Sequence, residues 1–155
     1  MNTLENVLRI LNEKRIGFKR TEHEAVRTSE EAAKIRGVEL KTGVKAMLLK
    51  TAEGKFIMVL IEADKRVDLK KIAGMEKTKK LSIAKPEEVL EETGCEPGGV
   101  PPFGYTKNRE PNKIKTYLDR NVLGNTEVNF NAGDRRISVS MNGADLDKIV
   151  DYIPF

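Results

Sequence analysis

Two apolar segments joined by a short turn restrict the fold of this 155-residue chain more than any other feature. Residues 43–51 and 56–61 are almost continuously apolar, and the turn between them, Ala-Glu-Gly-Lys at 52–55, is typical of a β-hairpin. Strands with one exposed face alternate apolar and polar residues, whereas strands covered on both faces are apolar throughout. The pair therefore predicts a hairpin inside a sheet that is covered on both faces, or in the wall of a small barrel.

Further strand-like segments occupy residues 18–22, 113–119, 127–131 and 136–141, with residues 121–125 separating the second from the third. Hairpin connections favour antiparallel pairing, because neighbouring antiparallel strands need only a tight turn between them. We therefore expect a mixed α/β fold of the α+β type, in which helices surround a mainly antiparallel sheet.

The first two helical segments carry recognisable end signals. Thr3 is a candidate N-cap for a first helix that Gly17 ends. Thr28 and Glu31 match a capping box, in which each side chain binds the backbone N–H of the other residue, and Gly37 ends this second helix.

Three later helices are expected from similar signals. Asp68 caps a short helix that ends at Gly74, and Pro86 occupies the first turn of another that ends at Gly94. Asn142 caps a final helix near the C-terminus. No repeat or linker interrupts the series, so we expect a single domain over residues 1–155.

Composition excludes several classes of site. The chain has one cysteine, Cys95, and one histidine, His23, which rules out an internal disulfide and argues against a zinc cluster, so we expect no metal and no cofactor. The net charge of +4 is compatible with a polyanionic partner but does not by itself indicate one. No apolar run reaches the roughly 18–20 residues of a membrane span, and the N-terminus lacks the basic region of a signal peptide. A cytoplasmic location is therefore expected.

Residues 94–104, Gly-Cys-Glu-Pro-Gly-Gly-Val-Pro-Pro-Phe-Gly, form a glycine–proline loop with four of the twelve glycines and three of the six prolines. Glycine lets backbone N–H groups approach a ligand closely, and proline stiffens the chain while removing a donor. Such a loop suits the presentation of main-chain groups to a small ligand. Its composition fits an ordinary turn between a helix and a strand equally well, so composition alone leaves both interpretations open.

Five features follow one another along the chain: His23, Thr-Ser-Glu-Glu-Ala-Ala at 28–33, Gly-Val-Lys-Ala at 43–46, the loop at 98–104, and Phe-Asn-Ala-Gly at 130–133. In this order and spacing the chain resembles the YbaK/prolyl-tRNA synthetase editing-domain family, the aminoacyl-tRNA deacylases that clear mischarged tRNA. The resemblance spans essentially the whole chain, which implies a free-standing protein that acts in trans.

The resemblance implies a fold, a reaction and a site. The family fold is a mixed sheet curled into an irregular barrel with helices packed around it. The reaction is metal-independent hydrolysis of the ester between an amino acid and the terminal adenosine of tRNA. Lys45 would be central to deacylation, and the G-x-x-x-P loop from Gly98 to Pro102 would line the pocket. Where the family often has a polar residue after the lysine, this chain has Ala46, so cysteine, alanine, serine and threonine stay open as substrates, with tRNA-Pro a candidate carrier.

Ester hydrolysis requires an attacking water, stabilisation of the developing oxyanion and a substrate held in register. The candidate catalytic groups are the ammonium of Lys45 and the backbone N–H groups of Gly98, Gly99 and Val100. No general base is evident in the loop, so we expect the vicinal hydroxyl of the tRNA to assist. The residues expected to contact the substrate are His23, Ala46, Pro101, Pro102, Phe103, Gly133 and Asp134.

Several of these residues also have a structural interpretation. Without the resemblance, Lys45 fits a solvated charge at a strand edge, and His23 fits a structural histidine at a strand end. Asp134 follows a glycine turn, where aspartate is common for conformational reasons. Cys95 adjoins the loop, but nothing near it in sequence would lower its pKa, so we expect an unreactive thiol and not a nucleophile.

Basic clusters at residues 77–80, 107–115 and 135–136 are candidates for contacts with tRNA phosphates, although charge runs are commonly solvated surface. Phe103 and Tyr105 are the candidates for stacking on bases. The expected partner is the aminoacylated 3′ end of tRNA, with an aminoacyl-tRNA synthetase as a second candidate. Two alternative functions remain: a non-catalytic module that binds aminoacyl-tRNA or a synthetase through the same pocket, and a binder of nucleotide phosphates.

Overall fold

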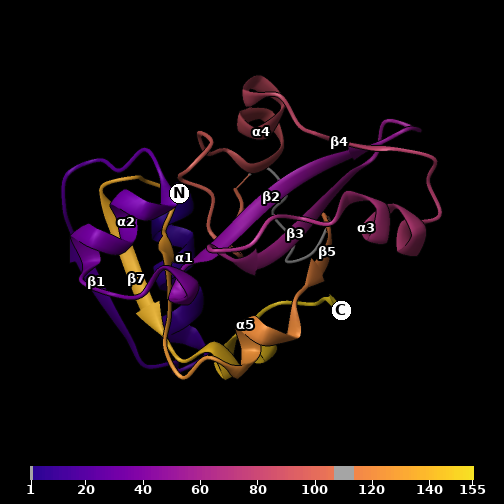
Figure 1. The fold of residues 1–155 in the computed structure, drawn as a ribbon. Coiled ribbons are helices and arrows are strands. Elements are labelled where there is room, and N and C mark those ends of the chain that lie inside the picture. The colour runs from indigo at the N-terminus through magenta and orange to yellow at the C-terminus, as the bar shows by residue number, and fades with distance from the viewer. Residues whose placement is uncertain (1, 107–113) are drawn as a thin grey trace.

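The strands form two sheets in the computed structural model, which describes residues 2–106 and 114–155 (Figure 1). The five-stranded sheet contains, in spatial order, β4 (Leu81–Ile83), β2 (Val44–Thr51), β3 (Phe56–Glu62), β5 (Lys115–Leu118) and β8 (Ile153–Pro154). The three-stranded sheet contains β1 (Phe18–Glu22), β7 (Ile137–Met141) and β6 (Val128–Asn131). An isolated bridge between Gly43 and Asn129 joins the two sheets.

Strand pairing confirms the mixed α/β fold. β2 and β3 form the antiparallel hairpin that the sequence predicts, with Val44 opposite Glu62 and Lys50 opposite Phe56. β5 pairs in parallel with β3 and β8, and the other ladders are antiparallel. Closure of the strands into an irregular barrel remains a prediction.

Helices flank both sheets in the described residues. They are α1 (Thr3–Glu13), α2 (Ser29–Arg36), α3 (Leu69–Glu76), α4 (Pro86–Thr93) and α5 (Arg120–Gly124), with 3₁₀ turns η1 (Leu40–Thr42) and η2 (Gly143–Lys148). In Figure 1, α2 lies beside β7, and α3 lies beside the five-stranded sheet. None of the helices in residues 2–106 and 114–155 is both long and apolar enough to cross a membrane.

Several helix ends form as the sequence predicts. The hydroxyl of Thr28 accepts a hydrogen bond from the N–H of Glu31 at 3.1 Å. The reciprocal bond of the predicted capping box differs, because the carboxylate of Glu31 accepts from the N–H of Arg27, one residue before the cap. Gly37 and Gly94 end α2 and α4 in the left-handed conformation, as expected.

The predicted ends of the first helix are both wrong. Asn2, and not Thr3, is the N-cap: its side chain accepts from the N–H of Glu5 at 2.8 Å, and the Glu5 carboxylate accepts from the N–H of Asn2 at 3.2 Å. Asparagine caps a helix somewhat better than threonine. At the other end, α1 stops well before Gly17, because the chain turns at Arg15, which has a φ of 56°.

Other predicted boundaries also require correction. Gly74 lies inside α3, which ends only where Lys77 adopts a φ of 58°. Residues 121–125 separate β5 from β6 as predicted, but residues 121–124 are helical and belong to α5, whose N-cap is Asp119. The segment after Asn142 is capped as predicted but forms a 3₁₀ turn instead of an α-helix. The strands β4 and β8 were not predicted, since two or three residues are too few to show a periodic pattern.

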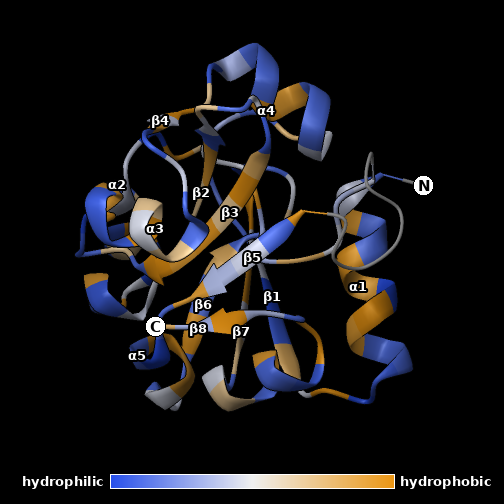
Figure 2. Ribbon diagram, turned by 90° about the vertical axis from the view of Figure 1, so that its right-hand side faces the viewer, coloured by the Kyte–Doolittle hydropathy of each residue, from blue (hydrophilic) through white to orange (hydrophobic). Residues whose placement is uncertain are grey.

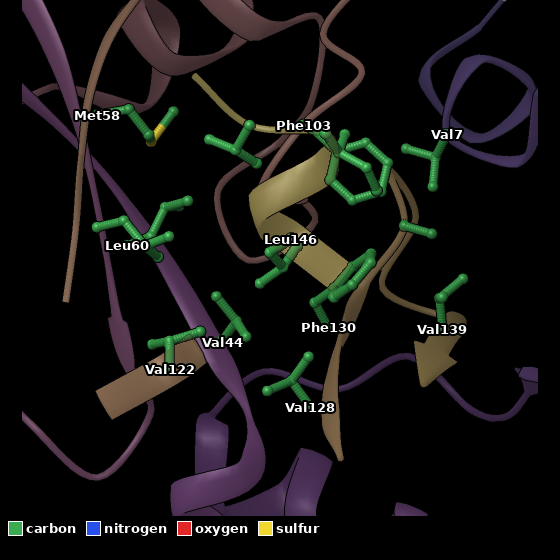
Figure 3. Packing of buried hydrophobic residues seen from close by; sticks show 14 of the residues in the cluster. Val7, Val44, Met58, Leu60, Phe103, Val122, Val128, Phe130, Val139 and Leu146 are labelled. Carbon is green, nitrogen blue, oxygen red and sulfur yellow. The ribbon is translucent and has the colours of Figure 1, made fainter. Parts of the chain in front are cut away.

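Apolar side chains cover both faces of the five-stranded sheet, as the continuous apolar pattern of its central strands predicts. On one face, Leu48 and Leu60 join a large core that includes Phe103 and Phe130. Figure 3 shows side chains from both sheets and from α1 gathered in this volume. Hydrophobic residues accordingly concentrate on the central strands in Figure 2. On the other face, a smaller cluster contains Leu49, Ile57, Val59, Ile61, Ile72, Leu81 and Tyr117.

Gly143→Ala is expected to lower the free energy of unfolding by about 1–3 kcal/mol, because an added Cβ would collide with the backbone carbonyl oxygens of Val122 and Asn125. Gly74→Ala is the matched control, since a Cβ inside α3 would meet nothing within 4 Å there. Because alanine has a higher helix propensity than glycine, Gly74→Ala should raise the free energy of unfolding by about 0.5–1 kcal/mol. Urea denaturation measures both changes, and effects of the same sign would contradict this expectation.

Glu76 links α3 to β5. The hydroxyl of Tyr117 donates to its carboxylate at 2.7 Å, and the ammonium of Lys115 lies 2.9 Å from the same oxygen. Burial opposes ionisation of this carboxyl group, but the two hydrogen bonds and the charge of Lys115 outweigh it. The pKa of Glu76 is therefore lowered below its ordinary value of 4.5.

Because the folded-state pKa of Glu76 is lowered, its contribution to stability is complete above the unfolded pKa and is lost as the pH falls through the folded pKa. Glu76→Gln should therefore destabilise the protein near neutral pH and have a progressively smaller effect below the unfolded pKa. Urea denaturation of both proteins over a series of pH values measures this. A destabilisation that stays constant down to the acid limit of folding would refute the linkage.

Candidate active site

A cavity of about 210 Å³ lies where the two sheets meet, among α2, the first residues of β2, β6 and the glycine–proline loop. Three cationic side chains line it, Arg27, Arg36 and Lys45, and no carboxylate or imidazole is among its described lining residues. The other lining groups are mainly small or apolar, with Asn129 and Asn131 as amides on β6. The cavity is thus positively charged.

Lys45 lies at the start of β2, where the sequence predicts it. Its Nζ donates to the carbonyl oxygen of Lys65 at 2.6 Å, which leaves two ammonium N–H groups for other acceptors. Burial lowers the pKa of Lys45, and Arg66 adds to this effect, while Glu30 and Asp64 oppose it. In the part of the chain that the structure describes, this ammonium forms no ion pair.

The glycine–proline loop brings backbone donors to the same cavity. Gly98 and Val100 line it, and the N–H groups of these two residues have no acceptor among the described residues. The N–H of Gly99 instead donates to the carbonyl oxygen of Glu96 at 2.9 Å. Two of the three predicted backbone donors therefore have no acceptor among the described residues, and the third is engaged in a turn.

The second half of the loop is buried. Pro101, Pro102 and Phe103 all have little exposed surface, and none of them lines the cavity. The ring of Phe103 packs edge-on against Phe130 with 5.7 Å between centroids, so it belongs to the core and offers no exposed face for base stacking. Ala46, in contrast, lines the cavity next to Lys45. Of the predicted stacking residues, Tyr105 also has a buried hydroxyl.

Gly133 and Asp134 lie outside the cavity. They line a separate hollow together with Gly99 and Cys95. Hydrogen bonds from Arg136, whose guanidinium is 2.9 Å from the Asp134 carboxylate, lower the pKa of Asp134. Burial raises the pKa of the Cys95 thiol, in agreement with the expected unreactive side chain.

Arg36 is the central polar residue of the cavity, and it is not among the site residues that the sequence predicts. From the end of α2 its guanidinium donates to the Oδ1 atoms of Asn129 and Asn131 on β6 and to the Oγ of Ser138 on β7, each at 2.7 Å. Burial lowers the pKa of Arg36 to about 10. His23 does not line the cavity, but its Nε2 lies 2.6 Å from the same Ser138 oxygen and so reaches this network.

Alternation in β6 and β7 is the sequence signal that could have revealed this network. Val-Asn-Phe-Asn and Ile-Ser-Val-Ser-Met place amide and hydroxyl side chains on one face and apolar side chains on the other. Polar groups on a covered face need hydrogen-bond partners, and α2 supplies one in Arg36.

The predicted basic clusters lie in different surroundings. Residues 135–136 form ion pairs with Glu96 and Asp134. The lysines of residues 77–80 are exposed after α3, whereas residues 107–113 lie outside the described part of the chain. Across the described residues, no three His, Cys, Asp or Glu side chains are grouped so that they could hold a metal ion.

Comparison with known families decides the family of this chain. The sequence profile described as the aminoacyl-tRNA editing domain matches residues 23–149. The chain belongs to the aminoacyl-tRNA editing domain family. The family predicted from sequence is therefore confirmed, as is the expectation of a hydrolase.

The relatives of this editing domain include proteins of similar length. It is 31% identical over 151 residues to the multifunctional Ser/Thr-tRNA deacylase ProXp-y of Escherichia coli (strain K12). The matched region covers 95% of this chain and 87% of the relative. It is 30% identical to the prolyl-tRNA editing protein ProX of Acetoanaerobium sticklandii, over 97% of this chain and 92% of the relative. A solved structure described as a candidate trans-editing enzyme for prolyl tRNA synthetase has 30% identity and a TM-score of 0.83, and covers 100% of this chain and 96% of its own.

Gly98→Ala tests how far the editing domain depends on the shape of its loop. Gly98 has a φ of 88°, and an added Cβ would lie 3.3 Å from the Cδ of Arg135. The left-handed conformation should cost about 1–2 kcal/mol of stability, and a displaced loop should slow hydrolysis of charged tRNA by on the order of 10–100-fold. Gly54→Ala is the matched control, with a φ of 85° in the β2–β3 turn and nothing near the added Cβ. Equal losses of activity in the two variants would contradict a specific role of the loop.

Proposed function

We propose that this editing domain is a trans-acting aminoacyl-tRNA deacylase, formed as a single domain by residues 1–155, that hydrolyses the ester of misacylated tRNA. The observation that carries the proposal is one cavity lined by the Lys45 ammonium and by Gly98 and Val100, whose N–H groups have no acceptor among the described residues. Action in trans is supported by the relatives named as a tRNA deacylase and an editing protein, which the chain matches over most of their length.

The groups around the cavity suit the stabilisation of negative charge. When water attacks the ester carbonyl, charge develops on the carbonyl oxygen, and cleavage of the C–O bond moves charge to the ribose oxygen. The ammonium of Lys45 and the N–H groups of Gly98 and Val100 are donors for these oxygens. The products are a free amino acid and a free hydroxyl on the terminal ribose.

The described lining residues of the cavity include no carboxylate or imidazole that could act as a general base. We therefore assign the activation of the attacking water to the vicinal hydroxyl of the terminal ribose. In this mechanism the protein contributes mainly by positioning the ester and by stabilising charge.

The amino acid that is removed from the tRNA is proposed to have a small side chain, because short residues such as Ala32, Ala33 and Ala46 surround a cavity of about 210 Å³. The candidates are serine, threonine, alanine and cysteine, and the relative named as a Ser/Thr-tRNA deacylase favours the first two. The proposed partner is the aminoacylated 3′ end of tRNA, whose phosphates complement the cationic wall.

Lys45→Ala is expected to lower the rate of deacylation by on the order of 100-fold, the usual cost of removing one donor to a developing oxyanion. The measurement compares tRNAs charged with cysteine, alanine, serine, threonine and proline. Lys50→Ala is the matched control, because Lys50 lies on the same strand with its ammonium 2.7 Å from Glu88, away from the cavity. Circular dichroism verifies that both variants remain folded.

Undiminished hydrolysis by Lys45→Ala would refute the role of this lysine. A wild-type protein that binds charged tRNA in a salt-sensitive manner but hydrolyses none of the five substrates would instead support the alternative, a non-catalytic module with the same pocket.

A further inference from the structure

One face of the three-stranded sheet is covered and yet polar. In β6 and β7 the side chains of Val128, Phe130 and Val139 enter the large core, whereas Asn129 and Ser138 point to the other face. Asn129 is 1% exposed and Ser138 is 2% exposed. An apolar face would be simpler to bury, because every covered amide or hydroxyl needs a hydrogen-bond partner. The polar groups on this face therefore need hydrogen-bond partners from the elements that cover it.

Arg36 supplies the partner for this polar face. Its Nε, Nη1 and Nη2 atoms each donate one hydrogen bond, to Ser138, Asn129 and Asn131 respectively. All three acceptors are neutral, and Arg36 forms no ion pair within residues 2–106 and 114–155. The rigid planar fork of a guanidinium fixes the direction of each of these bonds.

The Asn131 amide has only one favourable orientation. Its Oδ1 faces the Arg36 guanidinium at 2.7 Å, and its Nδ2 faces the carbonyl oxygen of Gly98 at 2.6 Å. A guanidinium only donates and a carbonyl only accepts, so rotation of the amide by half a turn would make both contacts repulsive. Arg36 thereby directs the Asn131 N–H toward the glycine–proline loop.

While His23 is neutral, the Ser138 hydroxyl cannot replace Arg36 as the hydrogen-bond donor to the Oδ1 of Asn131. The Nδ1 of His23 lies 2.7 Å from the carbonyl oxygen of Glu24, so this nitrogen carries the ring proton. Nε2 is then an acceptor, and the Ser138 hydroxyl donates to it at 2.6 Å. A hydroxyl has a single proton, so the longer contact of 3.4 Å between the Ser138 oxygen and the Oδ1 of Asn131 has no proton to share. Asn131 Oδ1 consequently depends on Arg36 for its donor.

We propose that Arg36 is a positioning residue for the hydrolysis: it orients the Asn131 amide, and that amide anchors the loop at Gly98 so that the adjoining N–H groups face the ester. This inference rests on the proposed function of the cavity. Asn131 is also close in sequence to Gly133, whose N–H donates to the carbonyl oxygen of Gly99 at 2.8 Å. The segment from β6 to β7 therefore holds two consecutive loop carbonyls.

A double-mutant cycle tests whether Arg36 acts through Asn131. Arg36→Gln and Asn131→Ala should each lower kcat for deacylation by on the order of 100-fold, with little change in KM, because the loop is misplaced. The double variant should be no more than a few-fold slower than either single variant. Losses that multiply to about 10⁴-fold would show that the two residues act independently, which would overturn the proposal.

Three further variants sharpen the test. Arg36→Lys keeps the charge without the planar fork and should not restore the rate, so full activity in this variant would overturn the proposal. Asn131→Asp keeps an acceptor for Arg36 but turns a carboxylate oxygen toward the Gly98 carbonyl, and should lose activity while it remains folded. Arg20→Gln is the matched control, because Arg20 is on β1 of the same sheet, is paired with Glu22 and does not line the cavity.

Amide hydrogen exchange of the protein without substrate separates this inference from the proposed function. The N–H of Gly99, which is bonded to Glu96 in the loop, should exchange about tenfold faster in Arg36→Gln and in Asn131→Ala than in the wild type. Unchanged exchange would overturn the Arg36 proposal whatever the activity. If the wild type hydrolyses no charged tRNA, the proposed function fails, and the exchange comparison alone decides whether Arg36 positions the loop.

Discussion

The junction between the two sheets is the constraint on which the site depends. Gly43 and Asn129 form a bridge there, and a Cβ on Gly43 would lie 3.0 Å from the Cβ of Ala63, so glycine relieves a tight contact beside the bridge. Residues two apart in a strand share a face, and Lys45 and Asn131 each follow a bridge residue by two positions. Both line the cavity. The bridge between Gly43 and Asn129 therefore helps to position both Lys45, the proposed catalytic cation, and Asn131, the proposed anchor of the loop.

The described lining residues of the cavity include positively charged side chains and no negatively charged ones. A buried cation is costly unless its donors are satisfied, and Arg36 meets this cost through three neutral oxygens, while Lys45 donates to a carbonyl oxygen. Neutral acceptors satisfy donors without cancelling positive charge. The cavity consequently favours a ligand or transition state that carries negative charge, which is what ester hydrolysis produces. The same arrangement explains why the described lining can lack a carboxylate and still be suited to this reaction.

The loop is held from its buried side as well. Phe103 packs against Phe130 in the core, and the Nδ2 of Asn6 on α1 donates to the carbonyl oxygen of Gly104 at 3.0 Å. A Cβ on Gly104 would lie 2.8 Å from the Cγ2 of Val7, so glycine permits this close approach of α1. The N-terminal helix thus supports the site although none of its residues lines the cavity.

The sequence by itself determined the features that depend on neighbours along the chain: the β2–β3 hairpin, the Thr28 cap, and Lys45 at a strand start, together with the family that their order indicates. It misplaced boundaries such as Gly74, where a helix tolerates a glycine. Only the tertiary structure showed that Phe103 is in the core and that Arg36 meets Asn131, 95 residues away in sequence. The physical reason is that such contacts follow from the packing of α2 on β6 and β7, for which a single segment carries no local signal.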